Sequence, residues 1–328
     1  MKARLVDSYG RCIDYLRVSI TDLCNLRCTY CRPPEGVELT THEEILRYEE
    51  ILTIVSVARD LGVRKIRVTG GEPLVRRGVV DFVSRLTALE GIEDVGLTTN
   101  GTLLSSLAAD LRAAGLRRIN ISLDSIDRET FRRITGQDKL SSVIEGIRIA
   151  LEIGFQPVKI NVVLLRGVNE PDIPQLARLT INNPLDVRFI ERMPFGNEVL
   201  PNAPSPFSAA KALEIVRREV GEPKRVSSGP LDGPATMFRL EGAKGRIGII
   251  DPVTGHFCGT CNRLRLTARG TLRPCLLGDH EIDIKSALRA GASKRELARI
   301  IRQAVDAKPL GSSVANNALK ERMNRIGG

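Results

Sequence analysis

Aromatic residues are scarce in this chain of 328 residues, and one kind is missing altogether. They make up 4% of the sequence, and there is no tryptophan. Proteins that bind single-stranded nucleic acids stack bases on aromatic side chains, and such platforms are few here. Lysine and arginine nevertheless outnumber aspartate and glutamate by 49 to 39, a net charge of +10, without forming a dense basic tract. This balance favours a small anionic ligand, and no nucleic acid, as the partner.

Long apolar runs are also lacking. No stretch approaches the roughly 20 apolar residues of a membrane span, and the opening residues, MKARLVDSYGR, contain no apolar region of a signal peptide. We therefore expect a cytoplasmic protein with no membrane partner. With 42% hydrophobic residues, the chain can bury a large core in one large domain or two ordinary ones.

Short β-rich segments alternate with helical patterns over the first 195 residues. The segments expected as strands are 15–21, 65–70, 94–100, 118–124, 158–165 and 186–191. Those expected as helices are 41–61, 77–90, 102–114, 139–153 and 172–181, the first opened by a capping-box pattern of Thr41 and Glu44. Such alternation indicates βαβ units on a parallel sheet. We therefore predict an α/β fold with an open or barrel-like sheet of these strands.

The predicted strands alternate between apolar and polar residues. In the first one, Leu16 and Val18 share one face while Arg17 and Ser19 share the other, and three later strands alternate in the same way. Parallel strands covered by helices on both faces are apolar throughout, and a closed eight-stranded barrel fills with branched apolar side chains. The polar face therefore predicts a lumen wide enough for water or a ligand. A simply solvated face is the alternative.

The pattern changes after residue 195. We predict a first domain over 1–195 and a smaller α+β region over 196–328, because residues 196–206 and 221–235 are rich in Pro, Gly and Asn. The elements expected in this region are a helix at 207–221, strands at 237–242 and 245–251, a hairpin at 263–276, two helices within 281–306 and a short helix at 317–325. Residues 308–309 and 311–313 are expected to form a flexible lead to the chain end.

Six of the seven cysteines form two triads. The front triad is Cys24, Cys28 and Cys31, and the rear triad is Cys258, Cys261 and Cys275. Cys12 is left over and is expected to be an ordinary thiol. In a reducing compartment such clusters indicate metal or redox chemistry and argue against a disulfide framework.

Each triad offers three local ligands, whereas a structural zinc ion requires four. The only histidines are His42, His256 and His280, and His256 lies two residues before Cys258. A zinc site at the rear triad therefore stays open. A cubane iron–sulfur cluster held by three thiolates leaves one iron free to bind a small ligand. The front triad, which has no such histidine, favours a cluster of this kind.

The segment CNLRCTYC, residues 24–31, has Cys-x3-Cys-x2-Cys spacing with an aromatic residue before the last cysteine, directly after the first predicted strand. It resembles the signature of the radical S-adenosylmethionine (SAM) superfamily. The resemblance implies a partial (β/α)6 TIM-like barrel in which Cys24, Cys28 and Cys31 hold a [4Fe–4S] cluster whose free iron binds SAM. Arg32 stands where the family usually has Met. It lies outside the triad, so we expect no loss of cluster binding.

Further motifs narrow the resemblance to the GTP 3′,8-cyclase family of molybdenum cofactor biosynthesis. They are TGGEPLVRRG (69–78), TTNG (98–101), NISLDS (120–125), FCGTCNRLRLTARGTLRPCL (257–276) and the terminal IGG (326–328). The resemblance covers essentially the whole chain, and the rear Cys-x2-Cys-x13-Cys motif is its most specific part. It implies a second [4Fe–4S] cluster, held by Cys258, Cys261 and Cys275 in the C-terminal region, that binds the guanine of the substrate.

The same resemblance assigns individual residues. Those implied to contact SAM are Tyr30, Gly70, Gly71, Glu72, Ser122 and Met193. Those implied to contact GTP are Arg17, Arg67, Thr98, Lys159, Arg263, Leu264 and Arg265. The tail is implied to reach into the active site. The residues expected to support catalysis are Arg17, Arg263, Arg265, Gly327 and Gly328.

The implied reaction converts GTP to (8S)-3′,8-cyclo-7,8-dihydroguanosine 5′-triphosphate, an early step of molybdenum cofactor biosynthesis. A radical made from SAM abstracts the hydrogen at ribose C3′, C3′ adds to guanine C8, and one electron and one proton complete the product. The reaction requires an external electron donor; a homodimer and transfer of product to the next enzyme of the pathway are left open. Two other interpretations remain: a radical SAM peptide-modifying enzyme with an auxiliary cluster, and a non-enzymatic, metal-dependent nucleic-acid binder.

Overall fold

A single curved sheet organises the chain in the structure, a computed structural model that describes residues 4–31, 40–41, 43–193, 207–229, 231–255, 257–311 and 326–327. Its twelve strands are hydrogen-bonded in the order β12-β11-β10-β1-β2-β3-β4-β5-β6-β9-β8-β7. The strands of the first half are β1 (Tyr15–Ser19), β2 (Lys65–Thr69), β3 (Asp94–Thr99), β4 (Arg118–Ser122), β5 (Val158–Leu164) and β6 (Leu185–Glu191). Those of the second half are β7 (Lys224–Val226), β8 (Thr236–Arg239), β9 (Arg246–Ile250), β10 (Arg263–Leu266), β11 (Thr271–Arg273) and β12 (Ile282–Asp283).

The six predicted strands are confirmed as β1 to β6, and neighbours among them pair in parallel. The C-terminal strands extend the same sheet at both of its edges. At one edge β10 pairs in parallel with β1, and at the other β9 pairs in parallel with β6. The predicted hairpin is confirmed as β10 and β11. The proposed boundary near residue 195 falls within 194–206, outside the described residues, so the division into two regions stays a prediction.

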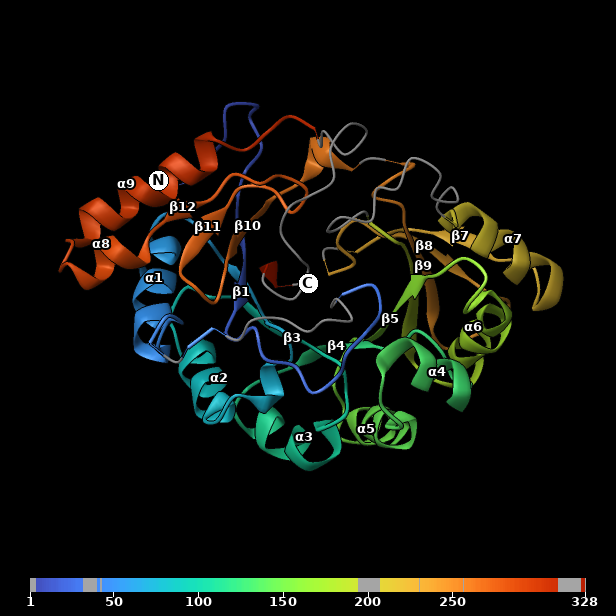
Figure 1. The fold of residues 1–328 in the computed structure, drawn as a ribbon. Helices are drawn as coiled ribbons and strands as arrows, with labels where there is room; N and C mark the ends of the chain where they lie inside the picture. The colour runs from blue at the N-terminus through green and yellow to red at the C-terminus, as the bar shows by residue number, and fades with distance from the viewer. Residues whose placement is uncertain are drawn as a thin grey trace.

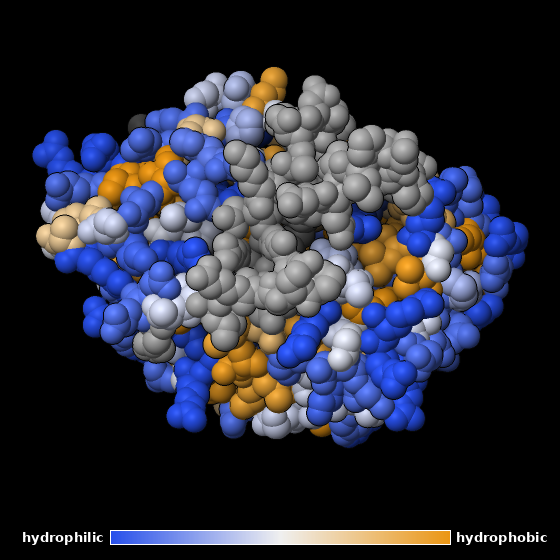
Figure 2. Space-filling model, in the orientation of Figure 1, coloured by the Kyte–Doolittle hydropathy of each residue, from blue (hydrophilic) through white to orange (hydrophobic). Residues whose placement is uncertain are grey.

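Helices cover the outer, convex side of the sheet, while the chain end lies within its curve (Figure 1). The helices are α1 (Tyr48–Asp60), α2 (Val79–Thr87), α3 (Leu104–Ala113), α4 (Arg128–Thr135), α5 (Leu140–Glu152), α6 (Ile173–Asn182), α7 (Ala209–Glu219), α8 (Lys285–Arg289) and α9 (Lys294–Asp306). Hydrophilic side chains cover most of the outer rim seen in Figure 2. The apolar faces of the strands are buried beneath the helices, as Leu16 and Val18 illustrate with 1% and 0% exposure. This side of the sheet forms the main core and leaves the polar side for the lumen.

The predicted start of the first helix at residue 41 is wrong. Thr41 does donate its backbone N–H and its hydroxyl to Glu44, but this pair closes only a turn. The helix α1 begins at Tyr48, where the backbone N–H of Arg47 donates to Glu50. The reason is the position of the apolar residues, because the buried side chains of α1 follow the second capping pair and not the first.

One helix, α4, was not predicted from the sequence. The N-cap of α4 is Asp127, whose carboxylate accepts from the backbone N–H of Thr130, and Gly136 ends the helix with a φ of 68°. Both signals stand in the sequence, but α4 has only eight residues and lies between β4 and a longer helix. Within the described ranges, no helix is both long enough and apolar enough to cross a bilayer.

The expected flexible lead to the tail is wrong at Lys308. This side chain is 4% exposed and donates three hydrogen bonds around the rear triad. The short helix expected at 317–325 and the segment 312–313 lie outside the described residues.

Candidate active site

The polar strand face lines a cavity of about 330 Å³ inside the curve of the sheet. The predicted lumen is therefore confirmed. Each of β1 to β6 contributes side chains to it, and the front triad lines the same cavity. Among the described residues, seven basic ones face it against two acidic ones, Asp94 and Asp232. The basic ones are Arg17, Lys65, Arg67, Arg118, Arg188, Arg263 and Arg265. A cavity with this excess of fixed positive charge is suited to a polyanion.

Three arginines stand in register on neighbouring strands at the cavity wall. Arg17 of β1 is the partner of Arg265 on β10 and of Arg67 on β2. Strands lie about 4.8 Å apart, and like charges directly opposite each other destabilise a sheet. A Cβ at Gly96, the register partner of Arg67 on β3, would lie 2.5 Å from Nη1 of Arg67. The sheet therefore makes room for a row of guanidinium groups at an energetic cost that a bound anion would offset.

The crowded positive charge shifts the ionisation of the cavity wall. Burial raises the pKa of Tyr15, but the positive charges of Arg67 and Arg17 outweigh it and lower this pKa to about 7. Burial, with Arg67 and Arg263 as like charges, lowers the pKa of Arg17 to about 10. Burial, again with Arg67, lowers that of Arg188 to about 9. The like-charge contributions to these shifts reflect a positive potential in the cavity, and that potential favours the binding of an anion.

Two polar atoms at the cavity are buried without a hydrogen-bond partner among the described residues. They are the hydroxyl of Thr98 and Nε of Arg263. Both residues line the cavity. Buried donors are normally satisfied, so these two point to a ligand.

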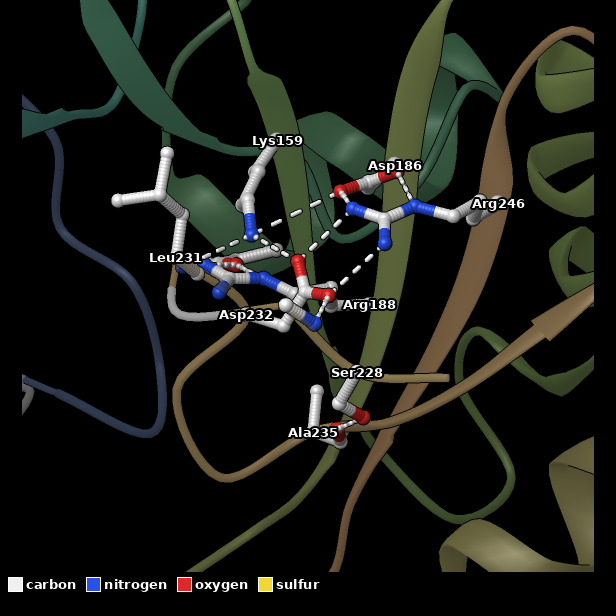
Figure 3. Close-up of polar contacts among 10 residues, drawn as sticks. Lys159, Asp186, Arg188, Ser228, Leu231, Asp232, Ala235 and Arg246 are labelled. Carbon is white, nitrogen blue, oxygen red and sulfur yellow. Dashed lines mark hydrogen bonds and ion pairs between the residues drawn. The ribbon is translucent and has the colours of Figure 1, made fainter. Parts of the chain in front are cut away.

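Lys159 shares the polar face but does not line the cavity. Figure 3 shows its ammonium group enclosed by acidic partners. It donates to Oδ1 of Asp232 and to the carbonyl of Leu231, both at 2.9 Å, and lies 3.6 Å from Asp186. Arg246 donates to both carboxylates with distances of 2.7–3.0 Å. This network fixes the segment that carries Leu231 and Asp232 over one end of the lumen, and it neutralises Lys159.

The front triad follows β1 and faces the cavity. The sulfur of Cys24 accepts from the backbone N–H of Leu26 at 3.4 Å and from the Asn100 amide at 3.7 Å. Burial raises the pKa of Cys28 well above its usual value, and the negative charges of Asp124 and of the other two cysteines add to this. The three sulfurs therefore lie close enough to repel as thiolates, which favours a cationic iron centre between them.

Tyr30 and Asp124 form a buried pair beside the front triad. The phenol donates to Oδ2 of Asp124 at 2.7 Å, and Oδ1 accepts from the backbone N–H of Val163 at 2.8 Å. Burial raises the pKa of Asp124 to about 6, although both hydrogen bonds oppose the shift.

The residues implied to contact SAM divide into two groups. Tyr30, Gly70, Gly71, Ser122 and Met193 line the cavity, whereas Glu72 does not. Glu72 is 0% exposed and accepts from the backbone N–H groups of Leu74 and Asn100 and from the Thr99 hydroxyl, at 2.6–3.0 Å. Burial raises the pKa of Glu72 to about 7 despite these bonds.

Gly70 and Gly71 are tied to the backbone that follows β1. An added Cβ would lie 2.7 Å from the carbonyl oxygen of Thr21 at Gly70 and 2.3 Å from that of Leu23 at Gly71. The glycines therefore let this stretch pack against the segment that leads into the front triad.

The rear triad lies just outside the cavity lining. Cys258 begins a short 3₁₀ helix (Cys258–Thr260), and the neighbours Asn262, Arg263 and Leu276 line the cavity. Burial opposes ionisation of Cys261, but the positive charges of Lys308 and Arg263 lower its pKa. Leu264, implied as a GTP contact, is 1% exposed and packs in the main core.

The described tail residues lie within the curve of the sheet. Nη1 of Arg265 donates to the carbonyl of Gly327 at 2.7 Å. Gly327 has a φ of +78°, and an added Cβ would lie 2.8 Å from Cβ of Ser19. Ile326 packs with Leu277 and Met193. Only glycine satisfies both the positive φ and the close approach at position 327, while Gly328 lies outside the described residues, as does Arg32.

Several cavity residues were not predicted to belong to the site, although the alternation of the strands places them on the polar face. Arg188 occupies the polar face of β6, and its Nε and Nη2 donate to Oδ1 of Asn161 at 2.9 and 2.6 Å. Lys65, Tyr15 and Arg118 belong to the same lining. Each stands in a predicted strand at an inward position.

Among the described residues, no three His, Cys, Asp or Glu side chains are arranged to hold a single metal ion. A cubane distributes its thiolates over separate irons, so it does not need three sulfurs that converge on one point. His256, which the zinc interpretation of the rear triad requires, lies outside the described residues, as does His42. His280 is exposed, and the leftover Cys12 is an exposed free thiol.

The sequence matches two known families in succession. Residues 18–180 match the Radical SAM superfamily, and residues 185–314 match Molybdenum Cofactor Synthesis C. The GTP 3′,8-cyclase of Desulforamulus reducens is 48% identical over 99% of this chain and 100% of its own length. That of Thermodesulfovibrio yellowstonii is also 48% identical, over 98% of this chain and 99% of its own.

Solved structures share the fold at low sequence identity. Streptococcus suis SuiB bound to S-adenosylmethionine superposes with a TM-score of 0.59 at 16% identity, over 90% of this chain and 69% of SuiB. Native anSMEcpe with bound AdoMet gives 0.57 at 16% identity, over 95% and 93%. These likenesses confirm the α/β radical SAM fold, and the relatives of nearly full length show that the chain belongs to the GTP 3′,8-cyclase family of the radical SAM superfamily.

Proposed function

We propose that this protein converts GTP to (8S)-3′,8-cyclo-7,8-dihydroguanosine 5′-triphosphate as an early step of molybdenum cofactor biosynthesis. The observation that carries the proposal is one cavity that joins the front triad to a row of three arginines in register. The first feature is needed to generate a radical, and the second to hold a polyphosphate.

Membership of the radical SAM superfamily implies a [4Fe–4S] cluster and SAM. The front triad fits that cluster, because its three cysteines line the cavity and their sulfurs lie close enough to interact electrostatically. When bound, the cluster and SAM supply a carbon-centred radical that abstracts a hydrogen atom from the substrate. The protein residues orient the two substrates and keep water and other hydrogen donors away.

For SAM we assign the contacts to the cavity-lining residues Tyr30, Gly70, Gly71, Ser122 and Met193. Glu72 has a different role in this proposal, because the hydrogen bonds that its carboxylate accepts all come from groups of the protein itself. Its carboxylate accepts from the backbone N–H of Asn100. This bond positions the side-chain amide of Asn100, which donates to the sulfur of Cys24. Because Glu72 is 0% exposed, it can accept from the SAM ammonium only if the residues that cover it move.

For GTP we assign the polyphosphate to the guanidinium row and to Arg188. Guanidinium forks donate paired hydrogen bonds to phosphate oxygens. Thr98 and Arg263 offer the two unsatisfied donors. Lys159 holds Asp232 in place at the edge of this site through a hydrogen bond. It can contact a phosphate only if Asp232 moves away.

We further propose that Cys258, Cys261 and Cys275 hold a second [4Fe–4S] cluster that faces the guanine. The support is their position beside the cavity residues Asn262 and Arg263, together with the positive charges of Lys308 and Arg263 that lower the pKa of Cys261. An external donor would supply one electron for the cleavage of SAM and a second that, with one proton, reduces the cyclised radical. The net change would move the C3′ hydrogen to 5′-deoxyadenosine, form the C3′–C8 bond and place the added proton on N7 of the guanine.

Anaerobic incubation of the reconstituted protein with SAM, GTP and a one-electron reductant tests the function. We expect 5′-deoxyadenosine together with an isomer of GTP that separates from GTP by chromatography. Consumption of SAM with GTP unchanged would contradict the proposal. Activity on a peptide in place of GTP would support the peptide-modifying alternative, and zinc as the only bound metal would support the nucleic-acid binder.

A further inference from the structure

Lys308 occupies an unusual environment beside the rear triad. Its side chain is 4% exposed, and Nζ donates to the sulfur of Cys261 at 3.4 Å. The other two donors go to the carbonyls of Arg263 and Pro274, both at 2.9 Å. The three hydrogens of the ammonium group are thus all directed at the rear triad and its flanking backbone.

No ion pair joins Lys308 to a carboxylate anywhere in the described part of the chain. A buried ammonium group without an anionic partner is strongly unfavourable. The two carbonyls satisfy its hydrogens but not its charge. The group that can neutralise it is the thiolate side of the rear triad, which becomes anionic when it binds iron.

A second basic side chain holds the Lys308 segment in place. Arg11 donates to the carbonyl of Cys258 at 2.7 Å, to that of Pro309 at 2.7 Å and to that of Leu310 at 3.2 Å. Its Nε is anchored by Oδ2 of Asp7 at 2.6 Å. Residues from the two ends of the sequence therefore converge on the rear triad, and Arg11 fixes the backbone on both sides of this contact.

We propose that Lys308, positioned by Arg11, sets the reduction potential and the stability of the rear iron–sulfur centre. This inference rests on the second cluster of the proposed function. One-electron reduction by the external donor adds a negative charge to the centre and neither makes nor breaks a covalent bond. A fixed positive charge and a hydrogen bond to a ligand sulfur stabilise the reduced form more than the oxidised form, which raises the potential.

The test uses the full chain with Cys24, Cys28 and Cys31 replaced by Ala, so that only the rear centre contributes signal. Lys308→Met is introduced into this parent protein, with Lys285→Met as a matched control. Lys285 donates to the carbonyl of Glu44, which belongs to neither triad. Iron content, the midpoint potential by EPR-monitored redox titration and the rate of iron loss to a chelator are measured for each protein.

In Lys308→Met we expect the reduction equilibrium to become at least tenfold less favourable, about 59 mV for a one-electron couple. We also expect iron loss to be ten- to a hundredfold faster, as for other residues that contact metal ligands. The control should match its parent. Full iron content with an unchanged potential and an unchanged rate of iron loss in Lys308→Met would overturn the inference.

A second variant is decisive if Lys308→Met retains no iron. Lys308→Arg keeps the charge, so the inference predicts that it keeps the centre. An equal loss of iron in Lys308→Arg would overturn the inference, because the site would then require only the shape of lysine. A parent protein that binds no iron would refute the second cluster itself, whereas an unshifted potential in an iron-loaded variant refutes only the role of Lys308.

Discussion

The two cysteine triads lie in opposite electrostatic surroundings. Negative charges, from Asp124 and the other two cysteines of the front triad, add to the effect of burial and raise the pKa of Cys28. The charges that lower the pKa of Cys261 in the rear triad are positive, from Lys308 and Arg263. In the proposed function the front centre donates an electron and the rear centre accommodates one. Negative surroundings suit the first role and positive surroundings the second.

The largest expected effects come from replacing one cysteine of either triad, because each triad should support a different step. Cys28→Ala should abolish SAM cleavage and leave about four irons per chain in the rear centre, because the triads are more than 200 residues apart in sequence. Cys261→Ala should retain SAM cleavage and lose the cyclised product. Iron analysis and chromatography of 5′-deoxyadenosine check both, with the exposed Cys12→Ala as control. Loss of all iron from either variant would refute two independent sites.

Removal of the tail should come next in size. Gly327 lies between Arg265 of the rear side and Ser19 of β1, so the tail connects the two halves of the site. Deletion of Gly327 and Gly328 should lower product formation from GTP by orders of magnitude while iron content, SAM binding and thermal stability stay near normal. Full product formation at equal iron content would show that the tail is an ordinary chain end.

Single arginines of the cavity wall should have a smaller effect. Arg17→Ala, Arg263→Ala and Arg265→Ala each remove hydrogen bonds to a charged group, worth about 1.5–3 kcal/mol, or roughly tenfold or more in GTP binding. SAM cleavage without GTP should persist, because the front triad is untouched. GTP titration of the anaerobic protein measures the loss, with the exposed Arg128→Ala as control. Normal GTP binding by all three variants would contradict the assignment of these arginines to the phosphate site.

The last effect concerns folding stability near the front triad and leaves turnover of GTP aside. The pKa of Glu72 is about 7 in the folded protein, against an ordinary 4.5, so the native state holds this proton more tightly than the unfolded chain. The free energy of unfolding should therefore be highest at low pH and fall by about 3 kcal/mol between pH 4.5 and 7 through this group. Glu72→Gln should flatten that slope in denaturant titrations without SAM, whereas the exposed Glu90→Gln should not. Equal slopes in Glu72→Gln and the parent would contradict the assignment.

Local patterns were enough to predict the front half of the molecule. Alternation within β1 to β6 predicted both the strands and the polar lumen, because each strand's faces follow from its own residues. Arg188 obeys the same rule and was missed only because no motif drew attention to it. The Cys24–Cys31 spacing likewise predicted a local site, and the three cysteines line one cavity.

Contacts between distant segments could not be predicted in the same way. The parallel pairing of β10 with β1 sets Arg265 beside Arg17, yet nothing in either strand specifies the other. The burial of Lys308 was not predicted, because the segment that follows it is held by Arg11 from the opposite end of the sequence. Glu72 was predicted to contact SAM, although its donors are the neighbouring Leu74 and two residues at the end of β3, Thr99 and Asn100.

Transfer of deuterium from the substrate tests the central claim most directly, namely that the front triad and the cationic wall act on GTP in one cavity. GTP deuterated at C3′ is incubated with SAM and reductant, and the 5′-deoxyadenosine formed is analysed by mass spectrometry. The account predicts deuterium in the 5′-deoxyadenosine of the intact enzyme, and unlabelled 5′-deoxyadenosine from a Cys258→Ala, Cys261→Ala and Cys275→Ala protein. Unlabelled 5′-deoxyadenosine from the intact enzyme, formed together with cyclised product, would contradict it.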